Sequence, residues 1–200
     1  MCANVIGYHA TSKSYSRNIN YGEDFDIKPF SDQTLKVGSK AETSSMPGDL
    51  GIGVYFFVDI GYGLTDPKTM ASRYYMRFKN HSYKEKPVVL KCEIDTEGYC
   101  ELDMNSSEHQ KEYNSFSIRN KEKIERIYKE NIRSSAAKER KVISGLIIEM
   151  MIRDLIKKGY VIDYVTQNTI TPTEHGGLHH TLPNCTEMCI RNKEMIVNVS

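Results

Sequence analysis

The segment Gly48-Asp49-Leu50-Gly51-Ile52-Gly53-Val54-Tyr55-Phe56-Phe57 decides the fold, because it leads from closely spaced glycines directly into an apolar run. Glycine lets the backbone approach another group closely, and the run that starts at Val54 has the composition of a buried β-strand. The dinucleotide fingerprint of doubly wound folds places its glycines before a helix instead. The segment therefore predicts a core strand with Tyr55 in its middle and a close backbone approach at its start.

Two further stretches have the same character at the two ends of the chain. Near the start, Val5-Ile6-Gly7-Tyr8-His9-Ala10-Thr11-Ser12 predicts an apolar strand over 5–8 and a turn over 9–12 that contains a histidine and small hydroxyl residues. Near the end, Thr186-Glu187-Met188-Cys189-Ile190-Arg191-Asn192 predicts a strand that a glutamate opens.

Together, the three stretches resemble the histidine, tyrosine and glutamate signature of ADP-ribosyltransferases of the poly(ADP-ribose) polymerase and diphtheria-toxin type. In that family the pattern runs from His-Gly-(Thr/Ser) through Gly-x-Gly-(Ile/Val)-Tyr-Phe to a glutamate that heads a strand. The resemblance extends from about position 5 to about position 197. It implies an α+β fold with a split mixed β-sheet core and flanking helices, and it implies NAD as the substrate.

The resemblance also assigns roles to residues of this chain. His9 would bond the adenosine ribose, the backbone of Ala10 would bond the nicotinamide amide, and Glu187 would bind the ribose hydroxyl and polarise NAD or the acceptor. Tyr55 would stack on the nicotinamide ring together with an aromatic residue of the following helix, in which Ala71 with Tyr74 and Ser72 with Tyr75 are both possible registers. The predicted catalytic residues are thus Glu187, His9 and Tyr55, and the predicted NAD contacts are His9, Ala10, Thr11, Gly53, Tyr55, Ser72, Tyr74 and Tyr75.

The chain departs from the family pattern at three points. Ala10 stands where the family has glycine, so that a methyl group is added next to the expected nicotinamide position. Cys185 stands two residues before Glu187, where the arginine-modifying branch has glutamate or glutamine. A long helical pattern over about 118–158 has no counterpart in the polymerase core.

Composition predicts one domain over 1–200, since 200 residues with 39% hydrophobic content can form one substantial core. The 27 basic and 26 acidic residues give a net charge of +1, which neither implies nor excludes a nucleic-acid partner. The five cysteines form no CxxC pair, and no leader segment is evident, so we expect reduced thiols in a cytoplasmic protein. No apolar run approaches the roughly 20 residues of a membrane span, so no membrane partner is expected.

Outside the three stretches, apolar periodicity predicts the remaining elements. Helices are expected over about 68–79 and within 120–158, the latter ending at Gly159. Strands are expected over 87–94, with 99–103 as its hairpin partner, over 160–165 and over 194–199. The polar loop over 167–182 contains three histidines, but no cysteine or acidic partner completes a zinc-ligand spacing, so no metal site is predicted.

The resemblance implies a mono-ADP-ribosyltransferase, and the composition favours one that acts inside the cell. A small enzyme of this type resembles toxins of toxin-antitoxin and phage-defence systems, with protein, RNA or DNA as the acceptor and an antitoxin as a possible partner. The alternative is a catalytically inactive module on the same fold that binds ADP-ribose, NAD or a partner protein. The RNA 2′-phosphotransferase branch requires an arginine and histidine set in place of Glu187, and the sequence shows none.

Overall fold

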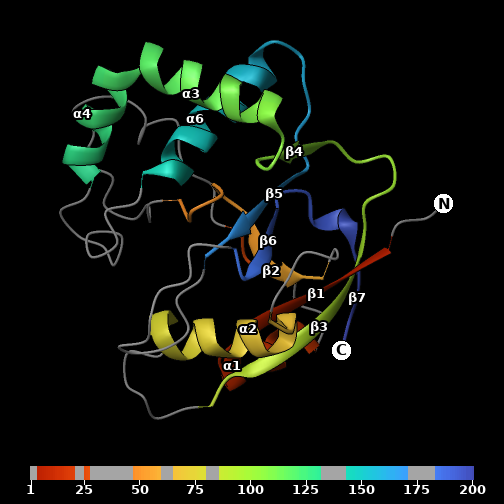
Figure 1. Cartoon of the computed structure of the whole chain (residues 1–200). Coiled ribbons are helices and arrows are strands. Elements are labelled where there is room, and N and C mark those ends of the chain that lie inside the picture. The colour runs from red at the N-terminus through yellow and green to blue at the C-terminus, as the bar shows by residue number, and fades with distance from the viewer. Residues whose placement is uncertain are drawn as a thin grey trace.

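The computed structural model describes residues 4–20, 25–27, 47–59, 65–79, 86–131, 143–170 and 183–200. These residues form a mixed α+β structure around a seven-stranded sheet with the strand order β4-β5-β6-β2-β1-β3-β7 (Figure 1). Neighbouring strands are antiparallel except for the parallel pair β4 and β5. The strands are β1 (Asn4–Thr11), β2 (Val54–Val58), β3 (Val88–Asp95), β4 (Glu101–Asp103), β5 (Tyr164–Thr169), β6 (Cys185–Ile190) and β7 (Ile196–Val199).

The described helices begin and end at residues suited to those positions. The carboxylate of Asp66 accepts hydrogen bonds from the backbone N–H and the hydroxyl of Thr69, which caps the helix that begins at Pro67. Gly159, with a φ of 90°, follows the last long helix in the left-handed conformation that glycine adopts without strain. The helices are α1 (Lys13–Asn20), α2 (Pro67–Tyr74) with its π-helical continuation η1 (Tyr75–Lys79), α3 (Ser107–Arg119), α4 (Lys121–Asn131), α6 (Ser144–Lys157) and the 3-10 turn η3 (Lys193–Met195).

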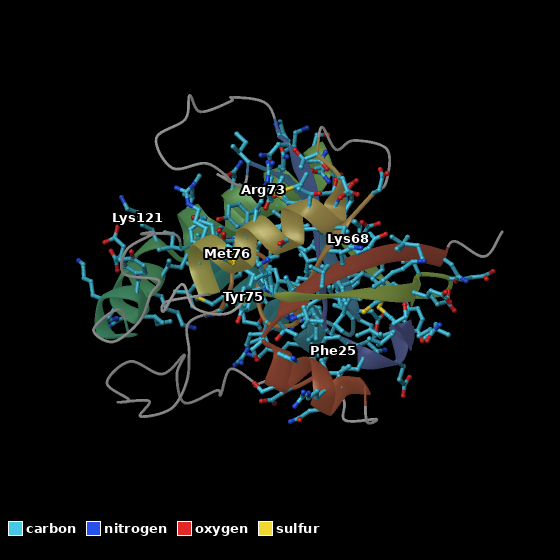
Figure 2. The ribbon with its side chains drawn as sticks, turned by 90° about the horizontal axis from the view of Figure 1, so that it is seen from below. Phe25, Lys68, Arg73, Tyr75, Met76 and Lys121 are labelled. Atoms are coloured by element: carbon cyan, nitrogen blue, oxygen red, sulfur yellow. The ribbon has the colours of Figure 1, made fainter. Side chains whose placement is uncertain are left out.

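Helices cover both faces of the sheet. Since side chains alternate along a strand, Cys185, Glu187 and Cys189 of β6 share one face, which α2 and α6 cover; we call it the α2–α6 face. The opposite face, which we call the α1 face, carries Phe56 and Met188 and packs against Ile19 of α1. Figure 2 shows α2 and α1 on opposite sides of the strands β1 and β3, with Tyr75 at the end of α2 and Phe25 beside α1.

The α2–α6 face has two separate hydrophobic clusters. The α2 cluster contains Phe57, Met70, Ala71 and Cys185, with Tyr8, Ala10, Tyr74 and Val89 packed against it. The α6 cluster contains residues of α3, α4, α6 and β5 together with Leu50 and Cys189, with Tyr55 packed against it. Figure 1 shows the corresponding separation of the helices, with α3, α4 and α6 beyond β5 and with α2 beside β1.

Four predictions about secondary structure are wrong in detail. Strand β1 continues through His9 to Thr11 instead of turning after Tyr8, because β3 pairs with it over its whole length. The segment 101–103 is not a hairpin partner of β3, because β1 and β7 occupy both edges of that strand, and it pairs in parallel with β5. Strand β5 begins at Tyr164, after the exposed Tyr160 and Val161. The helical region begins at Ser107, before the predicted insert.

Candidate functional site

Glu187 lies between the two clusters of the α2–α6 face. On one side of it along β6, Cys185 belongs to the α2 cluster, and on the other side Cys189 belongs to the α6 cluster. The neighbouring strand β2 is divided in the same way, with Phe57 in the α2 cluster and Tyr55 against the α6 cluster. We call this boundary, formed by Tyr55, Phe57 and Glu187, the seam. It places the predicted carboxylate and the predicted tyrosine on one face of adjacent strands.

Glu187 is 8% exposed, which is low for a carboxylate. The hydroxyl of Thr169 donates a hydrogen bond of 3.2 Å to its Oε1, and Gln167 is its cross-strand partner on β5. Both residues fall in the segment predicted as a loop. The signal for a strand was present, since β-branched residues recur at Val165, Thr166 and Thr169, but the polar Gln167 and Asn168 obscured it.

The hydroxyl of Tyr55 is bound within the protein. It donates to the carbonyl oxygen of Gly51 at 2.7 Å and accepts from the backbone N–H of Leu50 at 2.9 Å. Burial, together with the negative charge that Cys189 would carry, raises the pKa of this phenol well above its usual value, so it is neutral at physiological pH. Through these two hydrogen bonds, Tyr55 stabilises the turn that precedes β2, in addition to any contact that its ring makes with a ligand.

The glycines of the segment 48–53 make their close approach to the protein itself. A Cβ added at Gly48 would overlap the Tyr55 hydroxyl, and one added at Gly53 would overlap the carbonyl oxygen of Ile190. The helix α6 contributes Gly145, whose added Cβ would overlap the carbonyl oxygen of Gly48. Gly53 was predicted as an NAD contact, and in the described structure it packs against β6.

A buried ion pair, which the sequence reasoning missed, holds the same turn. Arg191 donates to both carboxylate oxygens of Glu149, at 2.7 and 3.1 Å, and their side chains are 16% and 3% exposed. Glu149 also accepts from the backbone N–H of Ile52 at 3.2 Å, and Arg191 donates to the carbonyl oxygen of Ile52 at 3.1 Å. Burial lowers the pKa of Arg191, but the hydrogen bonds and charge of Glu149 raise it more, so the guanidinium stays charged.

His9 lies where the sheet opens between β1 and β2. The ladder between these strands consists of Gly7↔Val58 and Tyr8↔Phe57, whereas β1 continues to Thr11 along β3. The imidazole Nδ1 of His9 bonds the carbonyl oxygen of Tyr55 at 2.8 Å, and as a donor to a carbonyl this nitrogen carries the proton. The ring packs against Phe25 and Phe56 on the α1 face. His9 is therefore joined to the seam through the Tyr55 backbone, from the other face.

The backbone of Ala10 points toward this opening. Lys91 exchanges both of its backbone hydrogen bonds with Ser200, so its partner Tyr8 turns its own N–H and C=O toward β2. By the alternation of an antiparallel ladder, Ala10 does the same, two residues beyond the last β1–β2 pair. Its methyl group packs against the α2 cluster, so the departure from glycine fills the core on that side.

The two registers left open for α2 differ in what they contact. Ala71 is buried in the α2 cluster, and the ring of Tyr74 packs against the ring of Phe57 with 5.7 Å between centroids. Tyr74 also contacts the ring of Phe78 at 5.0 Å. Ser72 is partly buried on α2, and Tyr75 begins the π-helical segment η1. The pair Ala71 and Tyr74 therefore faces the sheet next to the partner of Glu187.

The remaining predictions concern Thr11, metal and membrane. Thr11 is 8% exposed at the end of β1. Within the described ranges, no group of three histidine, cysteine or acidic side chains is arranged to hold a metal ion. The histidine loop over 171–182 lies outside the described residues. None of the helices that the structure describes is long and apolar enough to cross a bilayer.

Comparison of the chain with protein-family models, with curated proteins and with solved structures finds no match.

Proposed function

We propose that the protein is a mono-ADP-ribosyltransferase that cleaves NAD and transfers ADP-ribose to an intracellular protein or nucleic acid. The observation that carries the proposal is the position of Glu187, an almost buried carboxylate at the seam between two helical covers. Tyr55 lies on the same face of the adjacent strand, and Tyr74 packs against Phe57, the cross-strand partner of Glu187. The three motif strands β1, β2 and β6 are neighbours in the sheet.

The environment of Glu187 suits the charge that this reaction develops. Breaking the bond between nicotinamide and ribose places positive charge on the ribose in the transition state. A carboxylate with little solvent around it stabilises such a charge more strongly than an exposed carboxylate does. The Thr169 hydroxyl binds one carboxylate oxygen and so fixes the orientation of Glu187.

The end of the β1–β2 ladder suits the nicotinamide group. A carboxamide offers one acceptor and two donors, and a strand residue beyond the end of its ladder offers one N–H and one C=O that point the same way. Ala10 has this position, and Tyr74 supplies an aromatic ring from α2 above the same face. In the proposal, Ala10 binds the carboxamide and Tyr74 stacks on the ring.

The test is the cleavage of NAD by the purified protein, measured as nicotinamide released. We expect Glu187→Gln, which keeps the shape of the side chain and removes its charge, to lower the rate by about a hundredfold or more. Glu194→Gln is the matched control, because Glu194 is an exposed glutamate of the same C-terminal segment. Circular dichroism checks that both variants keep the wild-type fold.

Each outcome bears on the proposal. Equal rates for Glu187→Gln and the wild type would contradict it. Binding of NAD by the wild type without release of nicotinamide in any acceptor mixture would contradict it in favour of the binding module. Transfer of labelled ADP-ribose from NAD into lysate protein, RNA or DNA by the wild type alone would support it and identify the acceptor class. As a toxin, the protein should arrest bacterial growth on expression, and Glu187→Gln should relieve the arrest.

A further inference from the structure

A second candidate site lies on the α2–α6 face next to the seam. An open cavity of about 250 Å³ is lined by residues of α3, of α6 and of the middle of β5. Gln167 brings the cavity close to the seam, since Gln167 and Glu187 are cross-strand partners and therefore point to the same face. Directly opposed residues of an antiparallel pair have their Cα atoms about 5 Å apart. Figure 1 shows α3 and α6 together beyond β5.

The cavity is lined mainly by neutral polar side chains, which are Gln110, Tyr113, Asn114, Ser144 and Gln167. Gln110 donates to the carbonyl oxygen of Met104 at 2.8 Å. Among the described residues, the side chains of the other four make no hydrogen bond to the protein. Tyr113, Ser144 and Gln167 are partly buried, whereas Gln110 and Asn114 are exposed. Burial raises the pKa of Tyr113. The three partly buried polar groups without protein partners indicate a place for a polar ligand.

The chemistry of the lining restricts what the cavity can bind. None of the described residues that line it is charged, so these residues would not compensate a phosphate, a carboxylate or a guanidinium for lost hydration. Asn114 and Gln167 each present a donor and an acceptor, the pairing that side-chain amides use on base edges. Tyr113 supplies an aromatic ring, on which a planar base can stack. Met104 and Ile148 provide the apolar part of the lining.

The volume of the cavity also favours a single planar base as the ligand. Ligand pockets for drug-sized molecules are typically about 300–1,000 Å³. A cavity of about 250 Å³ holds one ring system and leaves the sugar and phosphate of a nucleotide outside. An extruded base of a nucleic acid is a group of this size and polarity.

We infer that this cavity is the acceptor subsite and that the acceptor is a nucleobase. The inference rests on the proposed function. In the transfer step, a ring nitrogen or an exocyclic amine of the base bonds to C1′ of the ribose while the C1′ bond to nicotinamide breaks. Nicotinamide takes the bonding electron pair and leaves as a neutral molecule, and the proton lost by the base nitrogen passes to the Glu187 carboxylate.

A binding experiment tests the subsite without NAD. The chain has no tryptophan, so Tyr113→Trp introduces a single indole whose fluorescence reports stacking in the cavity. We expect at least one of adenosine, guanosine, cytidine and thymidine to quench it, and Asn114→Leu in the same background to weaken that binding at least about tenfold. Ser115→Leu is the matched control and should not change the binding, because Ser115 is an exposed neighbour of Asn114 on the same helix and is not among the described lining residues. Nuclear magnetic resonance of the wild type with the same nucleosides replaces this measurement should Tyr113→Trp fail to fold.

A transfer experiment separates this inference from the proposed function. Wild type, Asn114→Leu and Ser115→Leu are incubated with NAD and a mixed-sequence single-stranded DNA and RNA oligonucleotide, and both modified oligonucleotide and free nicotinamide are measured. A ratio of modified base to nicotinamide that falls at least about tenfold in Asn114→Leu supports the subsite. Nicotinamide release with an unchanged ratio in Asn114→Leu would overturn the nucleobase subsite but not the proposed function. Binding of acetylated amino-acid amides in place of nucleosides would have the same meaning. Absence of nicotinamide release from the wild type overturns the proposed function, and the binding experiment still tests the subsite.

Discussion

Gly145 brings α6 against the turn that precedes β2. A methyl group at this position has no space, because the carbonyl oxygen of Gly48 and the backbone nitrogen of Gly51 already lie beside the Cα atom. Gly145 is the second residue of α6, and alanine has a higher helix propensity than glycine, so propensity alone predicts that Gly145→Ala stabilises the protein. The packing predicts the opposite.

We expect Gly145→Ala to lower the free energy of unfolding by about 3 kcal/mol, the upper part of the range for overpacked sites. Urea denaturation measures the change. Gly98→Ala is the control, since Gly98 has a φ of 77° and no atom within 4 Å of an added Cβ, so the change costs only backbone strain of about 1 kcal/mol. A smaller loss of unfolding free energy in Gly145→Ala than in Gly98→Ala would show that α6 does not pack this closely against the turn.

At the scale of elements, Glu149 and Arg191 join α6 to the end of β6 and to the turn before β2. Their hydrogen bonds to the N–H and C=O of Ile52 satisfy backbone groups that the turn leaves without strand partners. Removing Arg191 alone leaves the Glu149 carboxylate buried with the Ile52 N–H at 3.2 Å and, as the one remaining cation among the described residues near it, Arg153 at 3.6 Å.

We therefore expect Arg191→Met to lower the free energy of unfolding by about 3–5 kcal/mol. The double variant Glu149→Leu with Arg191→Met should lose less than the sum of the two single variants, because no charge then remains buried. A double-mutant cycle by urea denaturation measures this coupling. Additive losses would mean that the two side chains stabilise the fold independently.

The open end of the β1–β2 ladder makes a prediction about hydrogen exchange. The N–H of Ala10 points toward β2 beyond the last ladder pair, whereas Tyr8 lies within the ladder. We expect the amide of Ala10 to exchange at least about tenfold faster than that of Tyr8. In Glu187→Gln, which we expect to bind NAD without cleaving it, added NAD should slow exchange at Ala10. It should leave exchange at Lys91 unchanged, because the Lys91 N–H donates to the Ser200 carbonyl oxygen, on the side of β3 away from β1.

Amide exchange followed by nuclear magnetic resonance measures both rates. Protection of Ala10 equal to that of Tyr8 without NAD would show that the ladder continues past its last pair. If NAD does not change the exchange rate of the Ala10 amide, then Ala10 is not part of the proposed nicotinamide site.

The sequence was sufficient to predict the strands with strong local signals, but not all of their partners. Val54–Val58 is a strand as expected, because its apolar and β-branched residues follow each other without interruption. Cys185–Ile190 is also a strand, but it starts two residues before Glu187, which was expected to open it. The predicted hairpin between 87–94 and 99–103 is wrong. Adjacency in sequence favours such a hairpin, and only the pairing of β3 with β1 and β7 excludes it. Burial of Leu102 in the α6 cluster, which favours pairing with β5, depends on helices far along the chain.

The same limit applies to the candidate site. The order of the motifs in the sequence predicted one site for His9, Tyr55 and Glu187; their strands are neighbours, but only Tyr55 and Glu187 share a face of the sheet. Sequence patterns gave no sign that Glu149 and Arg191, 42 residues apart, form a buried pair, since each is a common surface residue type. They also gave no sign that the imidazole of His9 packs on the face opposite the Tyr55 ring, because that follows from strand register.

At the scale of the whole molecule, two buried thiols couple stability to alkaline pH. Burial raises the pKa of Cys92, on the α1 face, and of Cys189, in the α6 cluster, each to about 12. An exposed thiol in the unfolded chain has a pKa of about 8.5. The folded state therefore keeps both protons over a range in which the unfolded state loses them.

Because the unfolded chain binds fewer protons above about pH 8.5, the free energy of unfolding should be largest below that pH and fall as pH rises toward about 12. Each thiol contributes a slope of up to about 1.4 kcal/mol per pH unit in this window. Urea denaturation of the wild type and of Cys92→Ala between pH 8 and pH 11 measures the effect. The variant should show a shallower fall, whatever its stability at neutral pH, and equal slopes would show that the Cys92 thiol ionises equally in both states.

The contact between the His9 ring and the Tyr55 carbonyl has a consequence for the two strands that it joins. It lies beyond the pairs Gly7↔Val58 and Tyr8↔Phe57, so a side chain links β1 to β2 where their backbone ladder has ended. A side chain of similar size that cannot donate at this position, such as leucine, should therefore let the two strands move apart here.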